Sequence, residues 1–120
     1  MTKDSRHFTV CVLRCSDGSL FVTSTSASPG HCVAEYNAGR GRPFGIGRRP
    51  VSAAFAVDVG CDADDAVGVA WAIRELTRAA KERLCNDCPV TLQRVMARGR
   101  EIGQMRRELI KAQSGDDFDR

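Results

Sequence analysis

The sequence lacks two features that would place it in or across a membrane. No apolar run approaches the roughly 18–20 residues that a helix needs to span a bilayer. The first six residues also lack the apolar stretch of a secretory signal. We therefore expect an intracellular, cytoplasmic protein without a membrane-spanning segment.

A second pair of closely spaced cysteines is also absent. The chain has six cysteines, but only Cys85 and Cys88 form a CxxC motif. A structural zinc site needs four ligands and commonly uses two such pairs, and in an intracellular protein the six are expected to be reduced thiols. Cys85 and Cys88 allow two interpretations, a redox-active dithiol or a helix-capping loop. Their position between two predicted helices favours the loop.

Length and composition predict one small folded domain. The chain has 120 residues, of which 42% are apolar and 28% charged, as in an ordinary globular protein with one modest core. The net charge of +3 does not by itself indicate a polyanion partner. Its distribution is uneven, because residues 37–50 and 90–113 are basic and residues 51–73 are acidic. This alternation predicts a directional surface, with separate basic and acidic patches.

Local signals predict an α+β fold: a small, mainly antiparallel three-stranded sheet flanked by helices and extended by a C-terminal helix. The expected elements are a hairpin of residues 10–13 and 20–23, a short helix between Pro29 and Gly39, a strand at 51–59, helices at 62–76 and 77–84, and a long helix at 90–113. We divide the chain into a domain at 1–86, a helical extension at 87–113 and an acidic tail at 114–120.

Two further expectations concern the third strand and the last helix. The strand is apolar almost throughout, which predicts burial on both faces. The helix carries one apolar stripe, expected to cover the core, at Leu92, Val95, Met96, Ile102, Met105 and Leu109. Gly99 and Gly103 are expected to weaken its middle by roughly 1 kcal/mol each.

Four segments in a fixed order resemble the GIY-YIG nuclease family, in particular its small single-domain bacterial branch. They are the hairpin with its turn at residues 14–20, the helix exit at 37–41, the Arg48-Arg49-Pro50-Val51 segment and the helix junction at 73–79. The resemblance covers about residues 8–84. It implies a fold that cleaves phosphodiesters, in which a glutamate binds one Mg²⁺ or Mn²⁺, one tyrosine helps activate water, a second tyrosine lines the site and an arginine stabilises the phosphate.

The resemblance also implies that this chain lacks the catalytic side chains of the family. The two tyrosine positions fall at Cys11 and Phe21, the arginine position at Cys32 and the metal-binding glutamate position at Ala70. Phenylalanine has no proton to transfer, and alanine offers no oxygen ligand to a hard divalent cation. Asp65 and Glu75 lie on another face of the same predicted helix, so neither is expected to replace the glutamate. We expect no hydrolysis by the family mechanism.

The candidate binding residues are basic. Arg40, Arg42, Arg48 and Arg49 surround a glycine-rich loop, which indicates either a flap that grips phosphates or a solvated turn. The basic last helix has two interpretations as well, an extension of that footprint or a solvated face. A third possibility is a zinc or redox site at Cys11, His31 and Cys32, against small buried thiols as the simpler reading.

Three functions follow from these observations. The first is a catalytically inactive nuclease-like domain that binds DNA or RNA, or serves as an adaptor. The second is a protein-interaction or homodimerisation domain that uses residues 90–113. The third is a structure-specific endonuclease with an altered active site.

Overall fold

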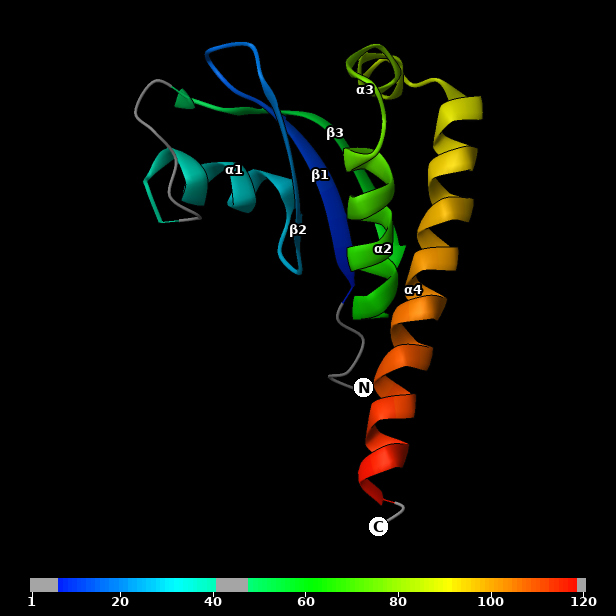
Figure 1. The fold of residues 1–120 in the computed structure, drawn as a ribbon. Helices are drawn as coiled ribbons and strands as arrows, with labels where there is room; N and C mark the ends of the chain where they lie inside the picture. Colours follow the sequence, from blue (N-terminus) through cyan, green and yellow to red (C-terminus); the bar gives the residue numbers. More distant parts are fainter. Residues whose placement is uncertain (1–6, 41–47, 119–120) are drawn as a thin grey trace.

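A three-stranded antiparallel sheet forms the centre of the molecule (Figure 1). The computed structural model describes residues 7–40 and 48–118, with side chains to residue 113. The strand order is β2 (Leu20–Thr25), β1 (Phe8–Arg14), β3 (Ser52–Gly60). The predicted α+β class is therefore confirmed.

The β1–β2 hairpin forms because its turn residues satisfy their own backbone. The Asp17 carboxylate accepts hydrogen bonds from the Ser19 amide at 2.9 Å and from the Ser19 hydroxyl at 2.6 Å. Gly18 adopts a φ of 88°, a left-handed conformation that favours glycine. These local contacts set the register in which Val12 lies opposite Val22.

The prediction that the third strand is buried on both faces is wrong. β3 is an edge strand, and Ala53, Ala56 and Asp58 on it are exposed. The strand buried on both faces is β1, where Val10, Cys11, Val12 and Leu13 are all 0% exposed. Small apolar residues fit an edge as well as a centre, so composition did not distinguish the two positions.

The two faces of the sheet carry two separate clusters, because successive strand residues point to opposite sides. α1 (Pro29–Asn37) covers one face, where Cys11 and Leu13 lie. α2 (Ala63–Arg74) covers the other, where Val10 and Val12 lie. Figure 1 shows α1 on one side of the strands and α2 with α4 on the other.

Short polar signals begin and end the helices. Ser28, Asp62 and Thr77 cap α1, α2 and α3 (Arg78–Cys85) by accepting backbone amide hydrogen bonds. α3 ends in a Schellman motif, in which the Cys88 amide donates to the Arg83 carbonyl and the Asp87 amide to the Leu84 carbonyl. α4 (Pro89–Phe118) follows at once, so the predicted last helix continues through positions assigned to an acidic tail.

Glycines allow α2 and α4 to approach closely. A methyl group built on Gly68 would lie 2.1 Å from the Gly99 carbonyl oxygen and 2.9 Å from the Gly103 amide nitrogen. One built on Gly99 would lie 2.5 Å from Val69 Cγ2. Gly99 and Gly103, expected only to weaken α4, are therefore the residues that let it pack on α2.

The apolar stripe of α4 is divided between core and surface. Val95 is buried in the α2-face cluster, with Leu92 and Met96 packed against it, whereas Met105 and Leu109 are exposed. The expectation that the whole stripe covers the core is therefore wrong. Among the described residues, no helix is long and apolar enough to cross a membrane.

Candidate functional site

Three of the four positions at which the resemblance expects catalytic groups lie on the α1 face of the sheet. Cys11 on β1 and Cys32 on α1 are 0% and 6% exposed and belong to the same buried cluster. Phe21 on β2 packs edge-to-face on Tyr36 of α1, with ring centroids 5.5 Å apart. The Tyr36 hydroxyl hydrogen-bonds with the Thr23 hydroxyl at 3.3 Å. The cluster, which we call the thiol–aromatic cluster, is packed as a second small core.

Burial keeps both thiols of this cluster protonated. Desolvation, together with the nearby Cys32, raises the pKa of Cys11 to about 11. Desolvation also raises the pKa of Cys32. Because the thiolate is the nucleophile and the metal ligand, neutral buried thiols are poor at both roles.

The structure does not bring His31 to the two thiols. Its side chain is 60% exposed, and its Nε2 lies 3.7 Å from the Glu35 carboxylate on the next turn of α1. Across residues 7–40 and 48–113, no three His, Cys, Asp or Glu side chains are grouped to hold a metal ion. The arrangement thus favours the simpler reading of Cys11 and Cys32 as small buried hydrophobic residues.

The fourth family position, Ala70, lies apart from the other three. It is 4% exposed and belongs to the α2-face cluster with Val10, Val12 and Val22. The four positions therefore do not form one site. The carboxylates nearest to it in sequence are turned to α4, where Asp65 pairs with Arg107 and Glu75 with Arg98.

Three of the four candidate arginines gather at one end of the sheet. The Arg49 guanidinium lies against Gly39, where an added methyl group would come within 2.8 Å of Nη1. Arg40 follows Gly39 directly and pairs with Glu35 at 3.1 Å. Arg48 hydrogen-bonds the Ser19 hydroxyl of the β1–β2 turn at 3.1 Å. Arg42 lies outside the described residues.

Backbone contacts hold this end of the sheet, which we call the arginine end (Arg40, Arg48 and Arg49), in place. The Ser16 amide donates to the Arg48 carbonyl at 3.1 Å, and the Ser16 hydroxyl donates to the Arg49 carbonyl at 3.1 Å. The Asn37 side chain makes two hydrogen bonds with the Val51 backbone, at 2.7 and 3.1 Å. The hairpin turn, the end of α1 and the start of β3 are thereby tied together.

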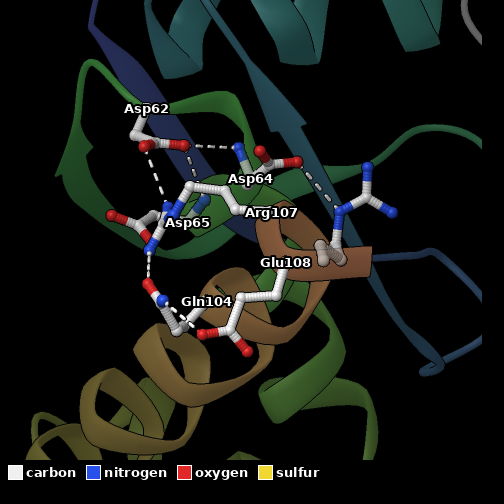
Figure 2. A network of polar contacts seen from close by, with 7 residues as sticks. Asp62, Asp64, Asp65, Gln104, Arg107 and Glu108 are labelled. Carbon is white, nitrogen blue, oxygen red and sulfur yellow. Dashed lines mark hydrogen bonds and ion pairs between the residues drawn. The ribbon is translucent and has the colours of Figure 1, made fainter. Parts of the chain in front are cut away.

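The acidic and basic zones predicted as separate patches lie side by side on α2 and α4 (Figure 2). Arg107 pairs with Asp62 at 2.9 Å and with Asp65 at 3.1 Å, and Arg106 pairs with Asp64 at 3.1 Å. The nearby acids raise the pKa of Arg107 further, chiefly through the hydrogen bond to Asp65. Two basic residues of α4 are thus paired with acids of α2, so the two zones meet here instead of forming separate patches.

No family model, curated protein or solved structure matches this chain. The placement of its own residues is therefore the basis for proposing a function.

The CxxC motif caps a helix, as the sequence predicted. Cys85 is the last residue of α3, and the Cys88 carbonyl accepts the Leu92 amide in the first turn of α4. The Thr91 hydroxyl donates to Cys88 Sγ at 3.4 Å and lowers the pKa of that thiol. Desolvation instead raises the pKa of Cys85.

Sequence reasoning missed one surface residue. Trp71, the single tryptophan, is 51% exposed on α2 and stacks with the Arg74 guanidinium at 5.9 Å from its centroid. Its neighbours Val69, Ala70, Ala72 and Ile73 are all buried. The available signal for its exposure was its position on the helix, one turn from Val67 and one turn from the charged Glu75.

Proposed function

We propose that this chain is a non-catalytic, nuclease-like module that binds nucleic acid through its arginine end. The observation that carries the proposal is the thiol–aromatic cluster. Where the family resemblance expects proton-transfer groups, this chain packs two neutral thiols and two rings in edge-to-face contact.

Such a cluster is suited to stability and not to phosphodiester chemistry. A hard divalent cation requires oxygen ligands, and an attacking water requires a general base within hydrogen-bond reach. The Tyr36 hydroxyl, which lies at the cluster, is hydrogen-bonded with the Thr23 hydroxyl. The closest substitutes for the missing glutamate are held by arginines of α4.

The arginine end supports binding of phosphates. Arg40 lies just after α1, and Arg48 and Arg49 lie just before β3. The contacts of Ser16 with the Arg48 and Arg49 carbonyls, and of Arg49 with Gly39, hold the two segments together. The Arg40 and Arg48 side chains remain 64% and 38% exposed. Guanidinium groups can make paired hydrogen bonds to phosphate oxygens, largely without regard to base sequence. At Arg40 a phosphate would have to displace the Glu35 carboxylate, to which Nε and Nη2 already donate.

A salt titration with matched variants tests the proposal. Labelled duplex and single-stranded DNA and RNA are titrated with the wild type, with Arg48→Gln/Arg49→Gln and with Arg94→Gln/Arg100→Gln. The last variant removes the same charge from exposed positions on α4. Each lost phosphate contact reduces the magnitude of the negative slope of log K against log salt by about 0.7–0.9. The first variant is therefore expected to reduce this magnitude by about 1.5.

The α4 variant is expected to keep the wild-type slope. Equal losses from both double variants would show that net charge alone drives the binding and would count against a defined arginine end. Absence of binding by the wild type at low salt would remove the nucleic-acid partner altogether.

A further inference from the structure

An apolar stripe on the outer side of α4 has no role in the core. Ile102, Met105, Leu109 and Ala112 recur at spacings of three, four and three residues, the pattern of a coiled-coil seam. Met105 and Leu109 are 52% and 62% exposed, Ala112 is exposed and Ile102 is half-buried. We call these four residues the outer seam.

The outer seam is distinct from the surface by which α4 packs on α2. That packing uses Gly99 and Gly103, which contact Val69, Gly68 and Asp65. At 100° per residue, Met105 and Leu109 lie more than a quarter turn from the direction of Gly103. α4 thus presents one side to its own chain and a second apolar side to solvent.

Trp71 extends the outer seam onto α2. Trp71 lies on one ridge of α2 with two acids: Asp64 comes seven residues before it and Glu75 four residues after it. Those acids pair with Arg106 and Arg98, which lie one turn on either side of Ile102. Trp71 and Ile102 therefore lie between the same two ion pairs, and the apolar patch has a charged border. An apolar centre with Trp and Met and a polar rim is typical of a protein–protein interface.

We infer that two copies of this chain associate through their outer seams, with the two α4 helices antiparallel. The seam is self-complementary under a two-fold axis beside Arg107. That axis places Met105 opposite Leu109 of the second copy, and Ile102 opposite Ala112. Because the spacing is the same in both directions, one copy of the stripe can pack on another.

The length of α4 leaves room for the second copy. α4 has 30 residues, roughly 45 Å, whereas α2 has 12, roughly 18 Å. Figure 1 shows the C-terminal part of α4 continuing past the start of α2. A helix end of this kind is marginal alone in water, and a second helix along it supplies the packing it lacks.

Charge is compatible with the antiparallel arrangement. The two-fold axis brings Arg106 near Arg106 of the second copy, where the two positive charges repel each other. The ion pair of each Arg106 with Asp64 offsets this repulsion. Glu108 also comes near Glu108 of the second copy. Its hydrogen bond from Gln104 does not neutralise its negative charge, so this repulsion remains. Glu108→Gln is therefore expected to strengthen the association of the two chains. The inference does not depend on nucleic-acid binding.

Sedimentation of the full chain in reducing buffer tests the inference. We expect the mass of two chains, dissociating on dilution over about the micromolar range because the seam spans only two heptads. Leu109→Glu is expected to weaken association at least about tenfold, since it places two carboxylates in the apolar centre. Because Leu109 is exposed in one chain, circular dichroism and Tm of this variant should match those of the wild type diluted below its association range.

Val90→Glu is the matched control, an equally exposed apolar residue of α4 outside the seam, 57% exposed. It should associate like the wild type, and the emission of Trp71 should shift to the blue on association in both. A single-chain mass up to about 1 mM, or association that Leu109→Glu leaves unchanged, would overturn the inference.

Discussion

Asp87 adopts a backbone conformation that suits glycine better. Its φ is 63°, and it occupies the left-handed position that ends α3 in the Schellman motif. Residues other than glycine pay a cost for this conformation, reduced for Asp and Asn by their short polar side chains. The junction holds because α3 and α4 are both anchored in the core by Leu84 and Val95.

Asp87→Gly is therefore expected to stabilise the fold by roughly 0.5–1 kcal/mol, since it removes the left-handed cost. Asp87→Ala lacks both the freedom of glycine and the local polar group, and should destabilise it. Urea denaturation of the two variants and the wild type measures both effects. A loss of stability in Asp87→Gly would show that the side chain matters more than the backbone.

Glu82 links β1 to α3 and should make stability depend on pH. Arg14 donates to both of its oxygens, at 2.8 and 3.1 Å, and Arg78 donates to one at 3.0 Å. The hydrogen bonds from Arg14, followed by those from Arg78, lower the pKa of Glu82 from 4.5 to about 2. A carboxyl with a lowered folded-state pKa stabilises the fold above its unfolded pKa and loses that contribution as the pH falls.

The wild type should therefore have a higher Tm than Glu82→Gln at pH 7, and the difference should shrink between pH 4.5 and pH 2. Thermal unfolding of both proteins at several pH values in this interval provides the measurement. A Tm difference that stays constant down to pH 2 would contradict the assigned ion pairs.

At the scale of elements, the contact of α2 with α4 depends on three glycines. Methyl groups at Gly68 and Gly99 would overlap the backbone or Val69 of the facing helix. Helices that meet through glycine lie closer than side chains otherwise permit, which brings Arg106 and Arg107 within reach of the acids that begin α2.

Gly99→Ala should destabilise the fold by about 2 kcal/mol, because the helices must separate to admit the methyl group. Gly30→Ala in α1 is the control, since its methyl group would lie 4.0 Å from the Ser28 hydroxyl oxygen. Helix propensity then predicts a stabilisation of up to about 1 kcal/mol for the control. Chemical denaturation compares them; equal effects would show that α2 and α4 do not approach as described.

The elements themselves were predictable because their signals are local. Asp17-Gly18 makes the hairpin turn, Asp62 and Thr77 cap helices, and Pro29 opens one, each through contacts within a few residues. The edge position of β3 and the role of Gly99 were not predictable, since both depend on a distant segment. A glycine opposite Gly68 and a glycine facing water have the same sequence signature.

The candidate site was predictable only in part for the same reason. The resemblance brought Cys11, Phe21 and Cys32 together, and the structure packs them on one face of the sheet. It grouped Ala70 with them, but the sheet separates Ala70 from Cys11. Nothing in the linear sequence showed that the arginines of α4 would be paired with the acids of α2.

At the scale of the whole molecule, the proposed binding surfaces are separate from the packed faces of the sheet. One end of the sheet carries Arg40, Arg48 and Arg49, the outer side of α4 carries the outer seam, and the two sheet faces are filled by apolar clusters. Association through the outer seam would place two arginine ends on one particle. Two linked sites raise the apparent affinity for a long nucleic acid without any new contact.

The most direct test of a binding module without nuclease chemistry is to incubate the protein with labelled branched, single-stranded and duplex DNA. Mg²⁺ or Mn²⁺ is present, and each reaction is run on native and on denaturing gels. The proposal predicts a retarded complex on the native gel and full-length strands on the denaturing one. Shortened strands that a chelator prevents, or no complex at low salt, would contradict it.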